Sequence, residues 1–314
     1  MEFGKVDDVS RINFDLPPLL EDSQNFLRSL PSPTAPQIFI GNPTWGSKKW
    51  LGKIYPSKSQ PKDFFSHYVQ QYSTIELNTT FYQIPEKDTI ERWKNTASLR
   101  QESKFKFCPK IFRGVSHHPR FGLDHTSAPL IEECIHVFSS FEDALGLCFL
   151  QIPSEASLQT HGTALKNFIE RLPTGFPLAL EFRHPSWFDG ASLRPKLVDY
   201  LRKRKISPVI TDVAGRRDVL HQSITSDSLM IRFIGNDLHP SDYQRIDTWV
   251  ERLKELISLG LRYIYFMAHE PEDTYAPELA SYLISKINSS GLSVSHAPIR
   301  FTESKSLPLQ KALF

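Results

Sequence analysis

Eight short apolar runs recur along this chain, and few of them alternate with polar residues. Strands that are buried on both faces, as in parallel sheets covered by helices, show such continuous apolar stretches. We therefore expect eight parallel strands. The runs are IFIG at Ile38, TIEL at Thr74, FKFC at Phe105, LCFLQI at Leu147, PLALEF at Pro177, SPVIT at Ser207, LMIRFI at Leu229 and YIYFM at Tyr263.

Amphipathic segments separate most of these runs and predict helices. Alternating strands and helices indicate an α/β fold, and the count of eight favours a TIM-like (β/α)8 barrel over an open doubly wound sheet. Only GRRDVLHQSITSD separates the sixth and seventh runs, which is short for a crossover helix, so the barrel is expected to be irregular there. The predicted helices span residues 62–72, 88–99, 129–145, 164–172, 193–204, 243–259 and 275–288.

Composition is consistent with one large domain, since 40% of the 314 residues are hydrophobic and 23% are charged. Residues 1–36 are interrupted by prolines and predict an N-terminal extension that wraps the surface or is mobile, before a barrel domain at 37–314. Three cysteines without CxxC spacing predict buried free thiols. No apolar stretch has the length of a signal peptide or a membrane span, so we expect a cytoplasmic protein with no membrane partner.

Polar residues should converge at one end of such a barrel, because the carboxyl ends of the strands meet at a single mouth. Glu181 and Arg183 lie two positions apart on the fifth strand and therefore point to the same side. A buried pair of this kind marks either a structural ion pair or the floor of a site. Other candidates at or after strand ends are Glu76, Asn78, Lys110, His117, Gln151, His184, Trp187, Asp212, Arg232, Asn236 and His269.

Glu76, Glu181 and Asp212 are the candidate catalytic residues. Neighbouring carboxylates in a partly desolvated mouth acquire different pKa values and can divide the roles of general acid and base. The structural alternative is that each carboxylate neutralises an inward-pointing Arg or Lys. The other candidates would bind substrate, and these are Asn78, Lys110, His117, Gln151, Arg183, His184, Trp187, Arg232, Asn236 and His269.

Lys110, Arg183 and Arg232 could together hold an anion, or could simply balance the acids. Gly235 and Asn236 follow the seventh strand, where barrels often present backbone N–H groups to phosphate. The aromatic residues near the rim either pack or stack on a base or sugar ring. They are Trp45, Trp50, Phe81, Tyr82 and Trp187.

Other kinds of site are less favoured. His117, His184 and His269, with the carboxylates, supply ligand types that suit zinc or manganese, but no HExxH-like spacing occurs. No metal ligands are therefore assigned, and the cofactor is left open with a divalent metal as one option. The sequence has no GxSxG motif and no cysteine at a rim position, and Gln151 and Arg232 occupy the positions where common barrel glycosidases carry carboxylates.

Several ordered blocks between residues 38 and 288 resemble the YecE-like family, also known as domain of unknown function 72. They include TIELNTTFYQIP from Thr74, FKFCPKIFRGVSHH from Phe105, LALEFRHPSW from Leu178 and VITDVAGRRD from Val209. The resemblance implies a TIM-like barrel and supplies no established reaction. The eighth strand departs from the family pattern, because Ala268 to Pro271 stand where many relatives carry an asparagine-rich turn. The family's charged blocks fall here on Glu76, Asn78, Lys110, His117, Gln151, Glu181, Arg183, Trp187, Asp212 and Arg232.

Two classes of function are consistent with these residues. The first is an enzyme of hydrolase or lyase type that uses acid and base chemistry on a small anionic substrate, phosphate-containing or derived from nucleic acid. Its cations would stabilise developing negative charge. The second is a barrel that binds an anionic ligand or a partner protein without chemistry. The net charge of +2 gives no support to nucleic acid itself as a partner, and the oligomeric state stays open.

Overall fold

Eight parallel strands form one sheet in the order β3-β2-β1-β10-β9-β8-β5-β4. The computed structural model describes residues 4, 6–31, 35–100, 104–118, 121, 123, 128–292, 294 and 296–302. The eight predicted strands are confirmed. They are β1 Gln37–Asn42, β2 Thr74–Leu77, β3 Lys106–Pro109, β4 Cys148–Gln151, β5 Leu178–Glu181, β8 Ser207–Asp212, β9 Ser228–Ile234 and β10 Tyr263–His269.

The edge strands β3 and β4 approach one another and nearly close the sheet into a barrel. The Gly146 N–H donates to the carbonyl of Phe107 at 2.7 Å, and the Ile111 N–H donates to that of Phe149 at 2.9 Å. Only isolated bridges join the two strands, at Phe107 with Leu145 and at Lys110 with Phe149. The predicted TIM-like architecture is confirmed, with a thin seam between β3 and β4.

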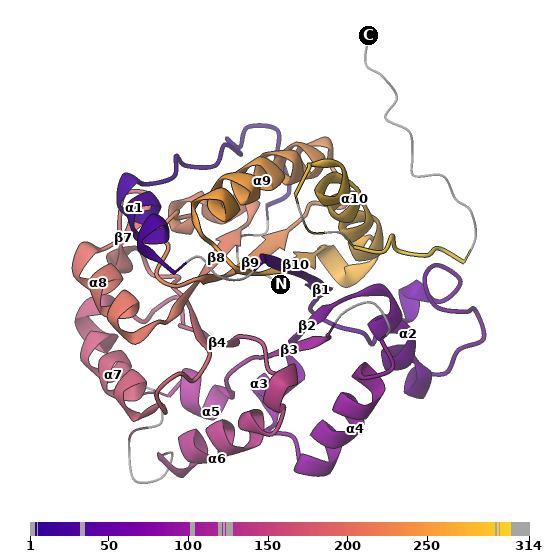
Figure 1. Cartoon of the computed structure of the whole chain (residues 1–314), viewed down its shortest axis with the longest axis horizontal. Coiled ribbons are helices and arrows are strands. Elements are labelled where there is room, and N and C mark those ends of the chain that lie inside the picture. The colour runs from indigo at the N-terminus through magenta and orange to yellow at the C-terminus, as the bar shows by residue number, and fades with distance from the viewer. Residues whose placement is uncertain are drawn as a thin grey trace.

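Helices surround the barrel (Figure 1). The predicted helices are present with shifted ends; α7, for example, begins at Leu158 because the Ser157 hydroxyl accepts a hydrogen bond from the Thr160 N–H. The helices are α2 Phe64–Gln71, α3 Thr79–Tyr82, α4 Lys87–Ala97, α5 Arg113–Ser116, α6 Ala128–Ser139, α7 Leu158–Arg171, α8 Pro195–Arg204, α9 Pro240–Leu259 and α10 Ala276–Ser289. Short 3-10 segments lie at Lys48–Trp50, Pro61–Asp63, Glu142–Ala144, Pro185–Trp187, Ala214–Val219 and Pro271–Asp273, and a small hairpin joins β6 Phe188–Asp189 to β7 Ser192–Leu193.

The connection between β8 and β9 is irregular, as the sequence predicted, because it holds only the 3-10 segment Ala214–Val219. A helix from the N-terminal part of the chain, α1 Glu21–Ser29, lies here beside α8 and α9 (Figure 1). The buried Ser23 hydroxyl donates to the Gln222 carbonyl and accepts from the Ile224 N–H, at 3.1 and 3.0 Å. Helix α1 therefore occupies the position that a crossover helix would otherwise fill.

The barrel interior is layered along each strand, and this places the site. Side chains alternate between the two faces of a strand, so residues two apart share a face. On seven of the eight strands, a residue of an apolar inner cluster is followed two positions later by a polar or small residue at the carboxyl end; on β2 the polar Thr74 precedes Glu76. The apolar layer contains Phe39, Cys108, Phe149, Ala179, Val209, Met230 and Met267, and the residues that follow are Gly41, Lys110, Gln151, Glu181, Thr211, Arg232 and His269.

The described part of the chain contains no helix long and apolar enough to cross a membrane. Its three cysteines are buried free thiols, which confirms that prediction.

Candidate functional site

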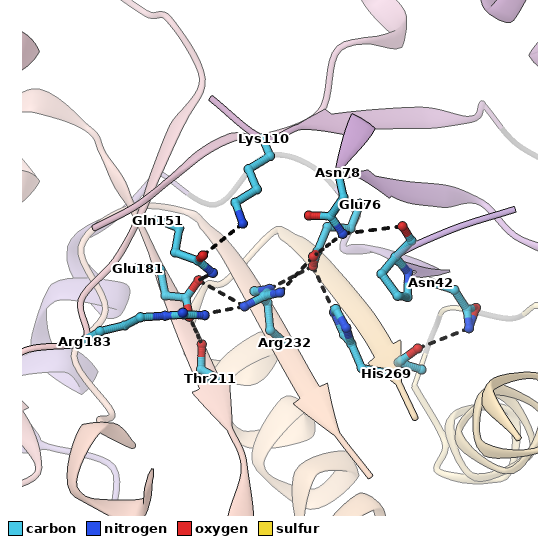
Figure 2. Close-up of polar contacts among 12 residues, drawn as sticks. Asn42, Glu76, Asn78, Lys110, Gln151, Glu181, Arg183, Thr211, Arg232 and His269 are labelled. Carbon is cyan, nitrogen blue, oxygen red and sulfur yellow. Dashed lines mark hydrogen bonds and ion pairs between the residues drawn. The ribbon is translucent and has the colours of Figure 1, made fainter. Parts of the chain in front are cut away.

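Arg232 joins two buried carboxylates across the barrel (Figure 2). Its Nε and Nη2 donate to the two oxygens of Glu76 at 2.8 and 2.9 Å. Its Nη1 contacts both oxygens of Glu181 at 3.1 and 3.2 Å. The guanidinium is thus shared between β2 and β5, and all three side chains are buried.

The remaining donors around these carboxylates come from neighbouring strands. Glu181 also accepts from Gln151 at 2.8 Å, from Thr211 at 2.9 Å and from Arg183 at 2.9 Å. Glu76 accepts from Asn78 at 2.9 Å, and its other oxygen lies 3.0 Å from His269 Nε2. We call these eight residues, together with Lys110, the mouth cluster; its full membership is Glu76, Asn78, Lys110, Gln151, Glu181, Arg183, Thr211, Arg232 and His269.

Both carboxylates are held ionised. Burial opposes ionisation, but the guanidinium groups of Arg183 and Arg232 outweigh it and lower the pKa of Glu181 to about 2. In the same way Arg232 and then His269 outweigh burial and hold the pKa of Glu76 well below its usual range. A carboxylate with several bound donors and a low pKa is a poor proton carrier near neutral pH. The geometry therefore favours a role for both as anchors of the cations.

Lys110 lies at the edge of the cluster and is 9% exposed. Its Nζ donates to Gln151 Oε1 at 2.9 Å and lies 4.3 Å from the centre of the Phe81 ring. Burial, followed by the charge of Arg232, lowers the pKa of Lys110 to about 8. His117 packs edge-on against the same Phe81 ring, with a centroid distance of 4.9 Å. Partial burial and then Lys110 lower the pKa of His117.

Asp212 is the one proposed catalytic residue that the structure does not bring into the cluster. It follows Thr211, which points inward to Glu181, so its own side chain points outward toward α9. There Asp212 accepts from Arg245 at 2.8 Å and from Trp249 Nε1 at 2.7 Å, and it also pairs with Arg217. Asp212 holds the barrel wall to α9, and this placement corrects the sequence prediction.

Three predicted binding residues also serve local structure instead. His184 Nδ1 accepts from the Ser186 N–H at 3.1 Å and caps the 3-10 segment that follows. The buried Trp187 donates from Nε1 to the Ala156 carbonyl at 2.7 Å. Asn236 bonds through its side chain to Asp242 at 2.9 Å. None of these three contacts reaches the mouth cluster.

The loop after β9 uses its N–H groups internally, contrary to the suggested phosphate site. The N–H groups of Gly235, Asn236 and Asp237 donate to the His269 carbonyl, the Asp242 carboxylate and the Glu270 carboxylate, at 2.8, 2.7 and 2.9 Å. An internal carboxylate thus occupies the position that an external anion would need.

Glu270 is a titratable residue to which the sequence assigned no role. It is 5% exposed, and its Oε1 has no hydrogen-bond partner among the described residues. Burial and then the neighbouring Asp242 raise the pKa of Glu270 to about 8. The glycine at position 235 is the sequence feature that could have pointed to this close contact, because a Cβ there would lie 2.4 Å from Glu270 Oε1.

The rim aromatics divide into two groups. Trp45 packs on Phe65 at a centroid distance of 4.5 Å, and Trp50 is fully buried, so both belong to the packing of the wall. Phe81, on α3, lies beside Lys110, and its neighbour Tyr82 packs edge-on against Phe81 and is 65% exposed. Only this second pair could meet a ligand at the mouth.

Several hollows in the structure lie away from the mouth cluster. One of about 550 Å³ lies at the opposite end of the barrel, between Phe39, Lys106 and Tyr265. Another of about 760 Å³ lies between α7 and α8. Within the described residues no group of three or more His, Cys, Asp and Glu side chains is arranged to hold a metal ion.

The fold and the cluster together define an α/β barrel protein with an ion-pair network at the C-terminal mouth. The chain belongs to the family described as "Protein of unknown function DUF72", which matches residues 39–301. It is 26% identical over 299 residues to the UPF0759 protein YecE of Escherichia coli (strain K12), covering 88% of this chain and 100% of that protein. It is also 26% identical over 155 residues to the UPF0759 protein YunF of Bacillus subtilis (strain 168), covering 48% of this chain and 52% of that protein.

A solved DUF72 family protein, EF0366 of Enterococcus faecalis V583, has a similar fold, with a TM-score of 0.62 at 16% identity. The similarity covers 81% of this chain and 98% of that one. None of these descriptions states a reaction.

Proposed function

We propose that the C-terminal mouth binds a small anionic substrate and that the protein is an enzyme of hydrolase or lyase type. The observation that carries this proposal is the charge of the mouth cluster. Lys110, Arg183 and Arg232 outnumber Glu76 and Glu181, and both carboxylates are already engaged by donors. The excess positive charge lies toward Lys110, where an anion would be stabilised.

In this proposal the proton carriers are Lys110 and His117. The pKa of Lys110 is lowered to about 8, near the range that suits general acid and base catalysis, and the lowered pKa of His117 favours its neutral, proton-accepting form. Glu76 and Glu181 are positioning residues that orient the guanidinium groups. Asn78, Gln151 and His269 complete the shell around the carboxylates.

A second candidate is a barrel that binds an anion without chemistry. The saturated hydrogen bonding of Glu76 and Glu181 favours it, because a stable ion-pair network resists the rearrangement that turnover requires. Both candidates share the anion site, and they differ in what happens to the ligand.

Thermal unfolding in different salts tests the anion site. Pyrophosphate, phosphate and citrate, each compared with sodium chloride at equal ionic strength, serve as probes. We expect at least one of them to raise the melting temperature of the wild type and of Lys254→Met, whose site is an exposed α9 position paired with Glu251. Lys110→Met should lose the increase. If no probe stabilises the wild type, or if Lys110→Met responds equally, the anion site is wrong.

Analysis of the ligand separates the two candidates. An enzyme consumes its ligand, so mass spectrometry after incubation with pyrophosphate, citrate or 4-nitrophenyl phosphate should show product with the wild type and none with Lys110→Met. Intact recovery of every probe that stabilises the wild type would favour the binding protein.

A further inference from the structure

The amine of Lys110 has an environment unlike those of several other described lysines. Its Nζ donates to an uncharged amide oxygen, that of Gln151, and no described carboxylate forms an ion pair with it. Lys49, Lys53 and Lys94, by contrast, each pair with a glutamate at 2.6 to 2.7 Å. The Lys110 amine lies 4.3 Å from the centre of the Phe81 ring and 5.9 Å from that of the Phe149 ring.

Burial and the neighbouring cations favour the neutral form of the Lys110 amine over the charged form. Desolvation and Arg232 lower the pKa of Lys110 from 10.5 to about 8. At neutral pH this raises the fraction of free amine by about two orders of magnitude over an ordinary lysine. A lysine that is desolvated and next to another cation is an activated nucleophile toward carbonyl compounds.

The rest of the mouth supplies the other groups that such chemistry needs. The guanidinium of Arg183, with 11% of its side chain exposed, adds positive charge near an approaching anionic group. His117 contacts the same Phe81 ring as Lys110 and is placed to exchange protons at the outer edge. These elements converge from β3, β5 and α5 through the barrel geometry.

We propose that Lys110 forms an imine with the carbonyl group of a small anionic aldehyde or ketone, while the cationic mouth holds the anionic group. This inference rests on the proposed anion site and names its substrate class. The lone pair of the neutral Nζ forms the N–C bond, and the C=O π pair moves to oxygen. One nitrogen-bound proton transfers to that oxygen. As the C–O bond breaks, His117 passes on a second proton that it has taken up from solvent, water leaves, and a protonated imine remains.

Reductive trapping tests the inference on the intact protein. The wild type is incubated with glycolaldehyde phosphate or pyruvate and sodium cyanoborohydride, and the modified lysines are located by peptide mass spectrometry. We expect labelling of Lys110 to exceed that of Lys254 by at least about tenfold, because of the larger fraction of free amine, and also to exceed that of Lys106, because Lys110 lies in the cationic mouth. Lys106 is a stringent control, since burial lowers its pKa too, but it lies at the start of β3 and donates to backbone carbonyls at the opposite end of the barrel. Propanal, which lacks an anionic group, should show a much smaller preference for Lys110.

Lys110→Arg retains a positive charge and removes the amine nucleophile, so it should lose the preferred adduct. Labelling spread evenly over surface lysines, while anions still raise the melting temperature, would overturn the imine and leave the anion site standing. If the anions also fail to stabilise the wild type, both proposals fail. The peptide map of the wild type needs no variant to fold, so the inference stays testable even if substitutions at Lys110 unfold the chain.

Discussion

Arg232 is the residue on which both buried carboxylates depend. Each of Glu76 and Glu181 receives two of its contacts. A buried ion pair adds little net stability, but removal of one partner leaves an uncompensated charge in a medium of low polarity. The network is therefore sensitive to the loss of its centre.

We expect Arg232→Met to lower the free energy of unfolding by about 3 to 5 kcal/mol, as measured by urea denaturation. Adding Glu76→Gln and Glu181→Gln to this variant should recover part of the loss, because the amides remove the unpaired charges. Arg28→Met is the control, since Arg28 makes exposed contacts with Asn25 and Gln24 and should cost less than about 1 kcal/mol. If the Arg232→Met protein is as stable as this control, removal of Arg232 does not leave a costly unpaired charge in the barrel.

Glu270 should make stability fall as pH rises. Its pKa is raised to about 8 from a reference value of 4.5, so between these values the folded state holds a proton that the unfolded state has released. The folded state therefore loses stability as pH rises from about 4.5 to 8. The charge of Asp242 adds to the rise in pKa, whereas the backbone N–H groups of Asp237 and Leu238 oppose it through hydrogen bonds to the carboxylate.

Glu270→Gln cannot titrate, so its melting temperature should increasingly exceed that of the wild type as pH rises from 5 to 9. The difference in stability should reach on the order of a few kcal/mol at the alkaline end. Glu272→Gln, an exposed position in the same loop, should instead follow the wild type. Parallel curves for Glu270→Gln and the wild type would show that the carboxyl is not protonated in the folded protein.

At the level of single residues, the alternation of side chains between the two faces of a strand determined which site residues the sequence could place correctly. Glu181 and Arg183 share a face because they are two apart, and they do lie together. The same rule separates Thr211 from Asp212, and its consistent use would have placed Asp212 outside the barrel. The raised pKa of Glu270 could not be predicted, because its cause is burial beside Asp242, which lies far along the chain.

At the level of elements, the strands were predictable and α1 was not. A strand that is buried on both faces has a continuous apolar sequence, whichever strands it pairs with. Helix α1, EDSQNFLRS, has only Ser23 and Leu27 buried, and its location depends on the connection between β8 and β9, where Gln222 lies 199 residues after Ser23. The two hydrogen bonds of Ser23 join these distant segments.

Ser23→Ala should therefore destabilise the protein by about 1 to 3 kcal/mol, because it leaves the Gln222 carbonyl and the Ile224 N–H buried without a partner. Ser29→Ala, in the same helix, removes an exposed hydrogen bond to Phe26 and should cost less than about 0.5 kcal/mol. Chemical denaturation of the Ser23→Ala and Ser29→Ala variants measures both losses in the free energy of unfolding. Equal losses would mean that α1 does not depend on its contact with the β8–β9 connection.

At the level of the whole molecule, closure of the barrel is uneven. Seven residue pairs join β9 to β10, whereas isolated bridges join β3 to β4. Lys110 and Gln151 lie on opposite sides of this seam, and their hydrogen bond crosses it. The proposed ligand site therefore spans the least connected part of the barrel.

Hydrogen exchange measured by NMR should reveal this difference. Local openings need less free energy where few hydrogen bonds must break. The amides of Ile111 and Gly146, which donate across the seam, should exchange at least about tenfold faster than amides at the centres of β9 and β10. Any probe anion that stabilises the wild type should slow exchange at Ile111 more than in β9, because it binds groups on both sides of the seam. Uniform protection around the barrel would show that the seam opens no more readily than the rest of the sheet. Equal slowing by the anion at Ile111 and in β9 would show that the anion does not bind across the seam.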